Sequence, residues 1–232
     1  THDALSAFTS LINTNQPNLD HLLIAQTRLR PTIPARRLLQ SPAGQALLSL
    51  DLSGNHLAAS AGEFLQQTLS ARHALGTLRL SECDLSHHAM AGMAMALRQA
   101  PELRRLDLGN NQLDDEALHD LFELSAGCPI EELDLMENAT SVTSLDTLAR
   151  SLSDLRKLSL NLPRRQHHVA VELEDEALSY GFDALEHLIL GDNAFELWGF
   201  LFEDRDAFPS LEHLTIETLP RQEEQLERWV ED

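Results

Sequence analysis

The stretch Leu47–Leu57, LLSLDLSGNHL, decides the fold of this chain because its pattern returns at a regular interval. Its leucines and its asparagine follow the spacing L-x-x-L-x-L-x-x-N-x-L. The segment LGTLRLSECDL starts 28 residues later, at Leu75, and LRRLDLGNNQL starts another 28 residues later, at Leu103. Weaker copies start at Leu19, Ile130, Leu155, Leu185 and Leu211. Eight copies of one unit thus span most of the chain, which is typical of stacked repeats.

Each copy predicts a short strand followed by an inward turn. Side chains alternate along a strand, so Leu50 and Leu52 face one side while Asp51 faces the other. A single repeat cannot bury its leucines, whereas a stack of repeats can. The polar residue of each pattern is expected to turn inward and satisfy backbone groups of adjacent coils. These structural ladder residues are Asn55, Cys83, Asn111, Asn138 and Asn193.

Between the strand motifs the apolar residues change to a helical spacing. The segment that starts at His87 and the segment that starts at Asp115 both place apolar residues three and four positions apart. Each unit is therefore strand, turn, helix and return. The pattern resembles the ribonuclease-inhibitor-like subfamily of leucine-rich-repeat proteins over roughly residues 19–219. The resemblance implies an α/β solenoid, a horseshoe with parallel strands on its concave face and helices on its convex face.

The whole chain, residues 1–232, is predicted to be a single repeat domain. A solenoid has no central core that grows with length, so the length only sets the number of repeats. We interpret residues 1–18 as an N-terminal cap helix, residues 19–219 as about eight repeats and residues 220–232 as a C-terminal cap helix. The basic segment RLRPTIPARR, residues 28–37, is interpreted as a solvated loop on the convex side.

Composition limits the classes of partner and the compartment. The formal net charge of −20 disfavours nucleic acid and anionic membrane, since both repel an acidic protein. No stretch approaches the roughly 18 continuous apolar residues of a membrane helix, and no signal peptide is visible. Both cysteines, Cys83 and Cys128, fall at structural positions of the repeat. A reducing, intracellular location in cytoplasm or nucleus is therefore predicted, or a host cell if the chain is a bacterial effector.

The repeat register predicts which side chains face the inside of the horseshoe. Neighbouring strands lie about 4.8 Å apart, so Arg79 is expected to pair with Asp51 or Asp107. Proteins that the pattern resembles bind other proteins on this face, and by analogy we expect a protein partner with a basic or mixed-charge surface. The predicted partner-binding residues of the concave face are Asp51, Arg79, Arg105, Asp107, Glu132, Asp134, Lys157, His187, Ile189 and His213.

The acidic C-terminal end is a second candidate surface. From Glu172 to Asp232 there are eighteen acidic residues against three arginines, a balance of −15. Leu197 and Phe200 lie off the apolar helical stripe of this region. An exposed apolar pair ringed by acidic residues would suit a basic, hydrophobic segment of a partner.

The sequence contains no signature of catalysis. It has no P-loop, G-x-G-x-x-G, G-x-S-x-G or H-E-x-x-H motif. His167 and His168 are adjacent and point apart on extended chain, so they make a poor metal site. No acidic residue is predicted to be buried beside a group that shifts its pKa. We therefore predict that the chain is not an enzyme and has no cofactor and no metal site.

Three functions remain open from the sequence. The first is a non-catalytic protein–protein interaction module, such as an adaptor, a scaffold or an effector. The second is a regulator of a GTPase, because Ran GTPase-activating proteins share this repeat type and, like this chain, are acidic near the C-terminus. The third is a structural repeat segment within a larger protein. The oligomeric state and the identity of the partner are not encoded in any motif.

Overall fold

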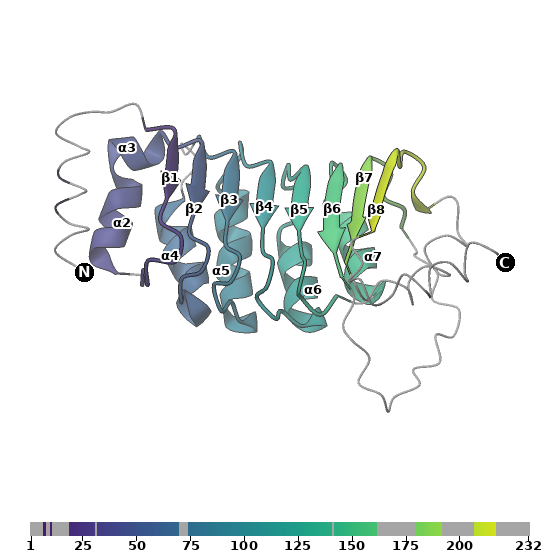
Figure 1. The fold of residues 1–232 in the computed structure, drawn as a ribbon, viewed down its shortest axis with the longest axis horizontal. Helices are drawn as coiled ribbons and strands as arrows, with labels where there is room; N and C mark the ends of the chain where they lie inside the picture. The colour runs from purple at the N-terminus through teal and green to yellow at the C-terminus, as the bar shows by residue number, and fades with distance from the viewer. Residues whose placement is uncertain are drawn as a thin grey trace.

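The structure is a computed structural model that describes residues 7, 10, 19–30, 32–69, 74–140, 142–161, 180–191 and 207–216. Eight short parallel strands form one sheet in the order β1 to β8, and they follow one another along the molecule (Figure 1). The strands are β1 (His21–Leu23), β2 (Ser49–Asp51), β3 (Thr77–Arg79), β4 (Arg105–Asp107), β5 (Glu132–Asp134), β6 (Lys157–Leu160), β7 (His187–Leu190) and β8 (His213–Ile216). The order of the strands in space is thus their order in the chain, as a solenoid requires.

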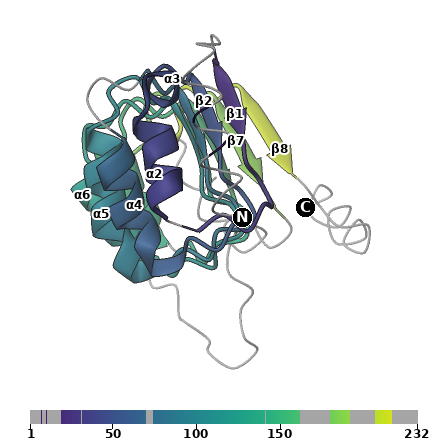
Figure 2. The same ribbon diagram turned by 90° about the vertical axis from the view of Figure 1, so that its left-hand side faces the viewer.

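Helices cover one face of this sheet and leave the other face open (Figure 2). Helix α5 begins at His87 and α6 begins at Asp115, where the sequence predicts them. The described helices are α2 (Ile33–Gln40), α3 (Pro42–Gln45), α4 (Ala61–Thr68), α5 (His87–Arg98), α6 (Asp115–Leu124) and α7 (Val142–Ser151), with a 3-10 turn, η1 (Ala58–Ser60), before α4. We call the open face of the sheet the concave face.

The core lies between the sheet and the helices. The repeat leucines are almost fully buried, with Leu50, Leu52 and Leu78 at 0% exposure. Burying one such side chain contributes about 1.5–3 kcal/mol, so a row of them stabilises the whole stack. From the helix side, Phe64 of α4 and Phe122 of α6 fill the same layer. Neighbouring strands keep one register, with Leu50 opposite Leu22 and Leu78.

The asparagines of the pattern form a hydrogen-bonded ladder inside the solenoid. The Oδ1 atom of Asn111 accepts the backbone N–H groups of Cys83 and Leu85 at 2.9 and 3.2 Å. Its amide donates to the carbonyl oxygens of Leu80 and Leu108 at 2.9 and 2.7 Å. Asn55 and Asn138 repeat these contacts on their own neighbours.

Cys83 occupies the equivalent ladder position of its own repeat but forms different hydrogen bonds. Its thiol donates to the carbonyl of Leu52 at 3.2 Å, while its own carbonyl accepts the N–H groups of Leu57 and Ala58. Asn193 lies outside the described residues. The ladder satisfies polar backbone groups that the leucine layers exclude from water.

The basic segment 28–37 differs from its interpretation as a loop. Helix α2 begins within it, at Ile33, and has a proline at its first turn. Proline is well tolerated there, because the first N–H groups of a helix have no partner within the helix. Arg36 of α2 lies 3.8 Å from the carboxylate of Glu63 on α4.

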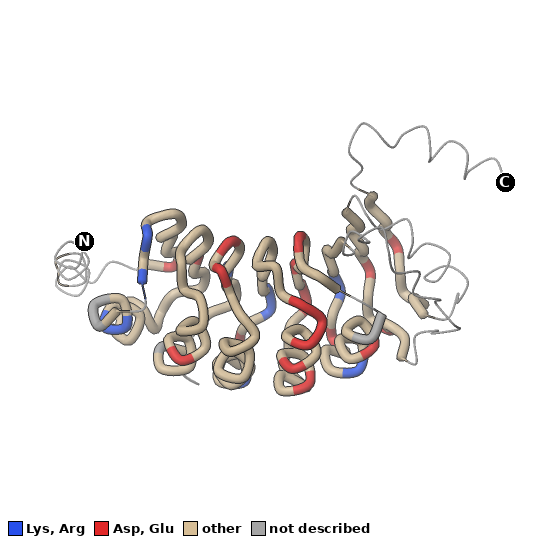
Figure 3. Tube along the Cα trace, turned by 90° about the horizontal axis from the view of Figure 1, so that it is seen from below, with Lys and Arg blue, Asp and Glu red and all other residues tan. Residues whose placement is uncertain are grey.

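Acidic residues recur along the repeats and on the helical layer, and Lys and Arg are fewer (Figure 3). Within the described part of the chain, no helix has the length and apolar character to cross a membrane. Both predicted cap helices fall essentially outside the described residues, since only positions 7 and 10 of the first are described.

Candidate functional site

The concave face presents two rows of side chains that run across the strands. The residues that start β3, β4, β5 and β6 stand opposite one another in register, and so do the residues two positions later. The upper row is His21, Ser49, Thr77, Arg105, Glu132, Lys157, His187 and His213. The lower row is Leu23, Asp51, Arg79, Asp107, Asp134, Ser159, Ile189 and Thr215.

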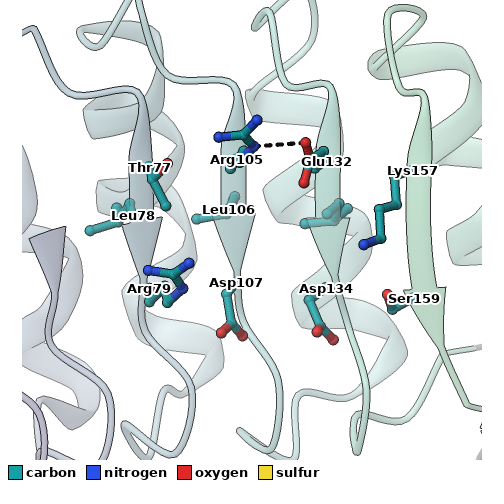
Figure 4. Close-up of a pocket in the computed structure, with 11 residues that line it drawn as sticks. Thr77, Leu78, Arg79, Arg105, Leu106, Asp107, Glu132, Asp134, Lys157 and Ser159 are labelled. Atoms are coloured by element: carbon teal, nitrogen blue, oxygen red, sulfur yellow. Dashed lines mark hydrogen bonds and ion pairs between the residues drawn. The ribbon is translucent and has the colours of Figure 1, made fainter. Parts of the chain in front are cut away.

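A shallow hollow lies at the centre of this face, over β3 to β6 (Figure 4). Its volume is about 150 Å³. Three repeat leucines form its floor, and polar or charged residues of both rows surround them. The lining is Thr77, Leu78, Arg79, Arg105, Leu106, Asp107, Glu132, Leu133, Asp134, Lys157 and Ser159. We call this feature the central hollow.

In the upper row, one ion pair joins the neighbouring strands β4 and β5. The Nε atom of Arg105 lies 2.7 Å from the Oε1 atom of Glu132, and this hydrogen bond raises the pKa of Arg105. Lys157 stands on the other side of Glu132 and extends from β6 toward β5 (Figure 4). Among the described residues, no carboxylate lies within 4.0 Å of the Lys157 amine.

In the lower row, three aspartates are held by the backbone of the turns that follow them. Asp51 accepts the N–H of Ser53, Asp107 that of Gly109 and Asp134 that of Met136, each at 2.9 Å. This is the local turn that Asp forms with the residue two positions on. The aspartates therefore have a structural role in ending each strand, and the carboxylates of Asp107 and Asp134 are fixed at the rim of the hollow.

Arg79 does not form the ion pair that the sequence predicts. In the described part of the chain, its guanidinium has no carboxylate within 4.0 Å, and the side chain is exposed. Asp51 and Asp107 are each bound to backbone N–H groups of their own turns instead.

Asp107 also corrects the expectation that no carboxylate has a shifted pKa. Burial raises the pKa of Asp107, and the charges of Asp134 and Asp51 raise it further. The N–H of Gly109 and the charge of Arg79 act in the opposite direction.

The C-terminal part of the concave face carries two stacked histidines. The rings of His187 and His213 lie 4.4 Å apart, at an angle of 6°. Ile189 and Thr215 stand in the other row beside them, so this part of the face holds aromatic, apolar and hydroxyl groups rather than carboxylates on its described strands.

The structure places the predicted concave-face residues on one face but not in one cluster. The central hollow is lined by Arg79, Arg105, Asp107, Glu132, Asp134 and Lys157, whereas Asp51, His187, Ile189 and His213 lie outside it. The prediction omitted Thr77 and Ser159, which their register positions would have revealed. Leu197 and Phe200, the C-terminal candidates, lie outside the described residues.

Sequence reasoning also missed Asn161, which lies two positions before the expected ladder position. It is buried, its Oδ1 atom accepts the N–H of Glu137, and its carbonyl accepts the Thr140 hydroxyl at 2.9 Å. An asparagine directly after the last leucine of a motif is the signal that could have found it. Over the described residues, no group of three or more His, Cys, Asp or Glu is arranged to hold a metal ion.

The chain is similar over part of its length to several known proteins. No family model matches the chain. Tonsoku-like protein of Mus musculus is 36% identical over 116 residues, which is 46% of this chain and 8% of that protein. Protein NLRC5 of Homo sapiens is 35% identical over 78 residues, 33% of this chain and 4% of that protein. Ribonuclease inhibitor of Mus musculus is 31% identical over 153 residues, 63% of this chain and 33% of that protein.

The fold, the repeat length and these similarities define a class. The chain is a leucine-rich-repeat protein, an α/β solenoid with parallel strands on its concave face. Within that class it is of the ribonuclease-inhibitor-like type, with repeats of about 28 residues. It spans a third or less of the length of each of these similar proteins.

Proposed function

We propose that this chain is a non-catalytic protein–protein interaction module, an adaptor, scaffold or effector that binds a protein partner through its concave face. The observation that carries the proposal is the central hollow, whose charged side chains stand in register on a rigid parallel sheet. Binding residues positioned by a rigid scaffold are a common arrangement in recognition proteins. The whole chain would then act as one repeat domain, residues 1–232.

The size and charge of the face favour a protein over other ligands. Small-molecule sites typically have volumes of about 300–1,000 Å³, and the central hollow has about 150 Å³. The net charge of −20 repels nucleic acid and anionic membrane. A shallow surface with both signs of charge suits a folded or extended protein segment, because complementary charges steer association and set register.

The local chemistry of the face supports a binding role rather than catalysis. Glu132 is bound to Arg105, and the lower-row aspartates are bound to backbone N–H groups. These contacts give each carboxylate a structural or electrostatic role within the protein, which requires no catalytic function. Both cysteines are free and buried, which fits an intracellular, reducing location.

The test is affinity capture with the whole chain, followed by direct binding measurements on the captured protein by calorimetry. The first variant reverses two concave charges, Arg79→Glu and Lys157→Glu, because neither side chain has an ion pair that the substitution would break among the described residues. The matched control reverses two charges on the helical side, Arg37→Glu and Arg98→Glu. Circular dichroism and thermal unfolding establish that both variants keep the fold.

We expect the concave variant to weaken binding of the partner at least tenfold, and the helical control to leave it within twofold. Equal binding by all three proteins would contradict binding through the concave face, and capture of no protein would leave the chain as a structural repeat segment. Loss of binding in the control alone would move the interaction to the helical face.

A further inference from the structure

The charged side chains around the central hollow are distributed unevenly, so that one end is negative and the other is positive. In the lower row, Asp107 on β4 and Asp134 on β5 stand opposite each other in register, so two carboxylates occupy neighbouring strands. In the upper row, Lys157 of β6 brings a cation to the other end of the same hollow. Between them, the ion pair of Arg105 and Glu132 carries no net charge. A negative end over β4 and β5 and a positive end at β6 follow from this arrangement.

The negative end is not cancelled by the nearby arginine. For the pKa of Asp107, the raising effect of the Asp134 charge outweighs the lowering effect of the Arg79 charge, and Asp51 adds to the raising side. A carboxylate in this field is stabilised by an additional cation. Arg79 itself is exposed and forms no ion pair with a described carboxylate.

At the positive end, the neighbouring carboxylate already forms an ion pair with another residue. Glu132, the register neighbour of Lys157, is bound to Arg105 at 2.7 Å. The register neighbour on the other side is His187, whose ring stacks on His213. The Lys157 amine extends over the hollow, and Ser159 adds a hydroxyl two residues later (Figure 4).

We propose that the hollow binds a bipolar segment of a protein partner, with a Lys or Arg side chain of that segment at Asp107 and a carboxylate side chain at Lys157. This inference rests on the proposed function, because it specifies what the concave face binds. Mixed charges of this kind give specificity and orientation more than affinity. The partner segment would therefore lie across the strands in one direction only.

The spacing of the two anchors defines the segment further. Asp107 and Lys157 are two strands apart and in different rows, a separation of roughly 12 Å from the spacing and rise of a β-sheet. On an α-helix with a rise of 1.5 Å per residue, about eight positions cover this distance. A helical partner would thus carry its basic and acidic anchors about two turns apart on one face.

The experiment selects peptides from a displayed random library on the whole chain, and uses the best-binding synthetic peptide as the probe. Selection is repeated with Thr77→Trp, which fills the hollow, so that only peptides sensitive to this substitution are kept. Affinities are then measured for peptide variants, with the basic residue replaced by citrulline or the acidic residue by glutamine. The protein variants are Asp107→Asn and Lys157→Gln.

The protein variants are chosen to keep the fold. Asn at position 107 retains an oxygen that can accept the N–H of Gly109, and Lys157 has no described ion pair to lose. Glu102→Gln and Glu116→Gln, at exposed positions outside the hollow, are the charge-matched controls for Asp107→Asn. Thermal unfolding of each variant checks that the solenoid is intact.

The expected result is that the peptide substitution and the protein substitution at the same contact do not weaken binding additively. Citrulline weakens binding to the wild type at least tenfold but has little further effect on Asp107→Asn, and glutamine behaves likewise with Lys157→Gln. Peptides that are blocked by Thr77→Trp but show no coupling at either anchor overturn this inference and leave the proposed function standing. If no selected peptide is sensitive to Thr77→Trp, both the inference and binding at the hollow are wrong.

Discussion

Gly62 of α4 and Gly92 of α5 pack backbone against backbone. A Cβ atom on Gly92 would lie 2.6 Å from the carbonyl carbon of Gly62 and 2.8 Å from its Cα atom. A Cβ atom on Gly62 would lie 2.3 Å from the carbonyl oxygen of Ala89. These distances are shorter than van der Waals contact, and the opposing atoms belong to the backbone. The two helices therefore approach this closely only because both positions are glycine.

Substitution of Gly92 by alanine should lower the free energy of unfolding by about 1–3 kcal/mol, the usual cost of forcing an extra methyl group into packed structure. The gain in helix propensity from Gly to Ala, about 1 kcal/mol, is expected to offset only part of this cost. Urea unfolding measures the difference. The control is Gly76→Ala, since the nearest atoms to its added Cβ would lie at 3.6 and 3.8 Å. A Gly92→Ala protein as stable as the wild type would show that the helices can move apart freely.

Asn111 bonds backbone groups of two neighbouring coils through its side chain, and its removal should be costly. Alanine at this position would leave the backbone groups of Cys83, Leu85 and Leu80 without their side-chain partner, and the carbonyl of Leu108 would keep only its bond from the amide of Asn138. Buried groups left without partners cost roughly 1–3 kcal/mol each, although water entry reduces the sum. We expect Asn111→Ala to lower the free energy of unfolding by about 2–4 kcal/mol in urea titrations.

The same slot in the preceding repeat provides the comparison. Cys83→Ala removes a weak thiol donor at 3.2 Å and leaves the bonds from Leu57 and Ala58 to the residue 83 carbonyl in place. Its cost should therefore be smaller than that of Asn111→Ala. A larger cost at position 83 would mean that volume, rather than hydrogen bonding, dominates the stability of the ladder.

The strand positions and the helices α5 and α6 could be predicted from the sequence, because each depends on the local spacing of apolar residues. Leucines at alternate positions fix which side of a strand is buried, and the repeat then fixes the register of the next strand. Rows such as Arg105 and Glu132 follow directly, and the structure shows their side chains 2.7 Å apart. Geometry of this kind is set by the backbone and carries over from one repeat to the next.

The features that the sequence did not reveal depend on choices between competing partners. Asp107 can bond to an arginine across the sheet or to its own turn, and the turn is closer in the chain, so the ion pair with Arg79 does not form. In the segment 28–37, prolines suggest a loop but also start helices, and α2 takes the second option. The spacing of residues does not decide either case, because both alternatives fit the same sequence.

Asp107 should make the stability of the solenoid depend on pH. Because its pKa is raised in the folded state, the native protein holds this proton more tightly than the unfolded chain does. The stabilisation is present below the unfolded pKa and is lost as the pH rises through the folded value. Asp107→Asn, which is neutral and keeps an acceptor for Gly109, should thus be more stable than the wild type at pH 7, by at most about 1 kcal/mol because the side chain is partly exposed.

Urea titrations at pH 7 and pH 3.5 measure this effect, since the two proteins should converge at the lower pH. Asp154→Asn, at an exposed position outside the concave face, controls for the change in net charge. A wild type that is more stable than Asp107→Asn at pH 7 would show that the ionised carboxylate contributes more through its hydrogen bond than it loses through burial and repulsion.

Cys83 should behave as an unreactive thiol whose ionisation opposes folding. Burial raises its pKa to about 11, and the nearby charges of Asp51, Asp84 and Asp107 act in the same direction, against a backbone N–H of Asn55 that lowers it. Because the thiolate is the reactive form, iodoacetamide at pH 8 should alkylate the folded Cys128→Ser protein at least a hundredfold more slowly than the same protein in urea. Between pH 9 and 11 the unfolded thiol ionises while the native thiol stays protonated, so stability should fall, on the order of 2 kcal/mol from this group. Cys83→Ala lacks the group and should show a smaller decline over that range. Equal alkylation rates in the folded and unfolded protein would mean that the ladder opens at position 83 on the time scale of the reaction.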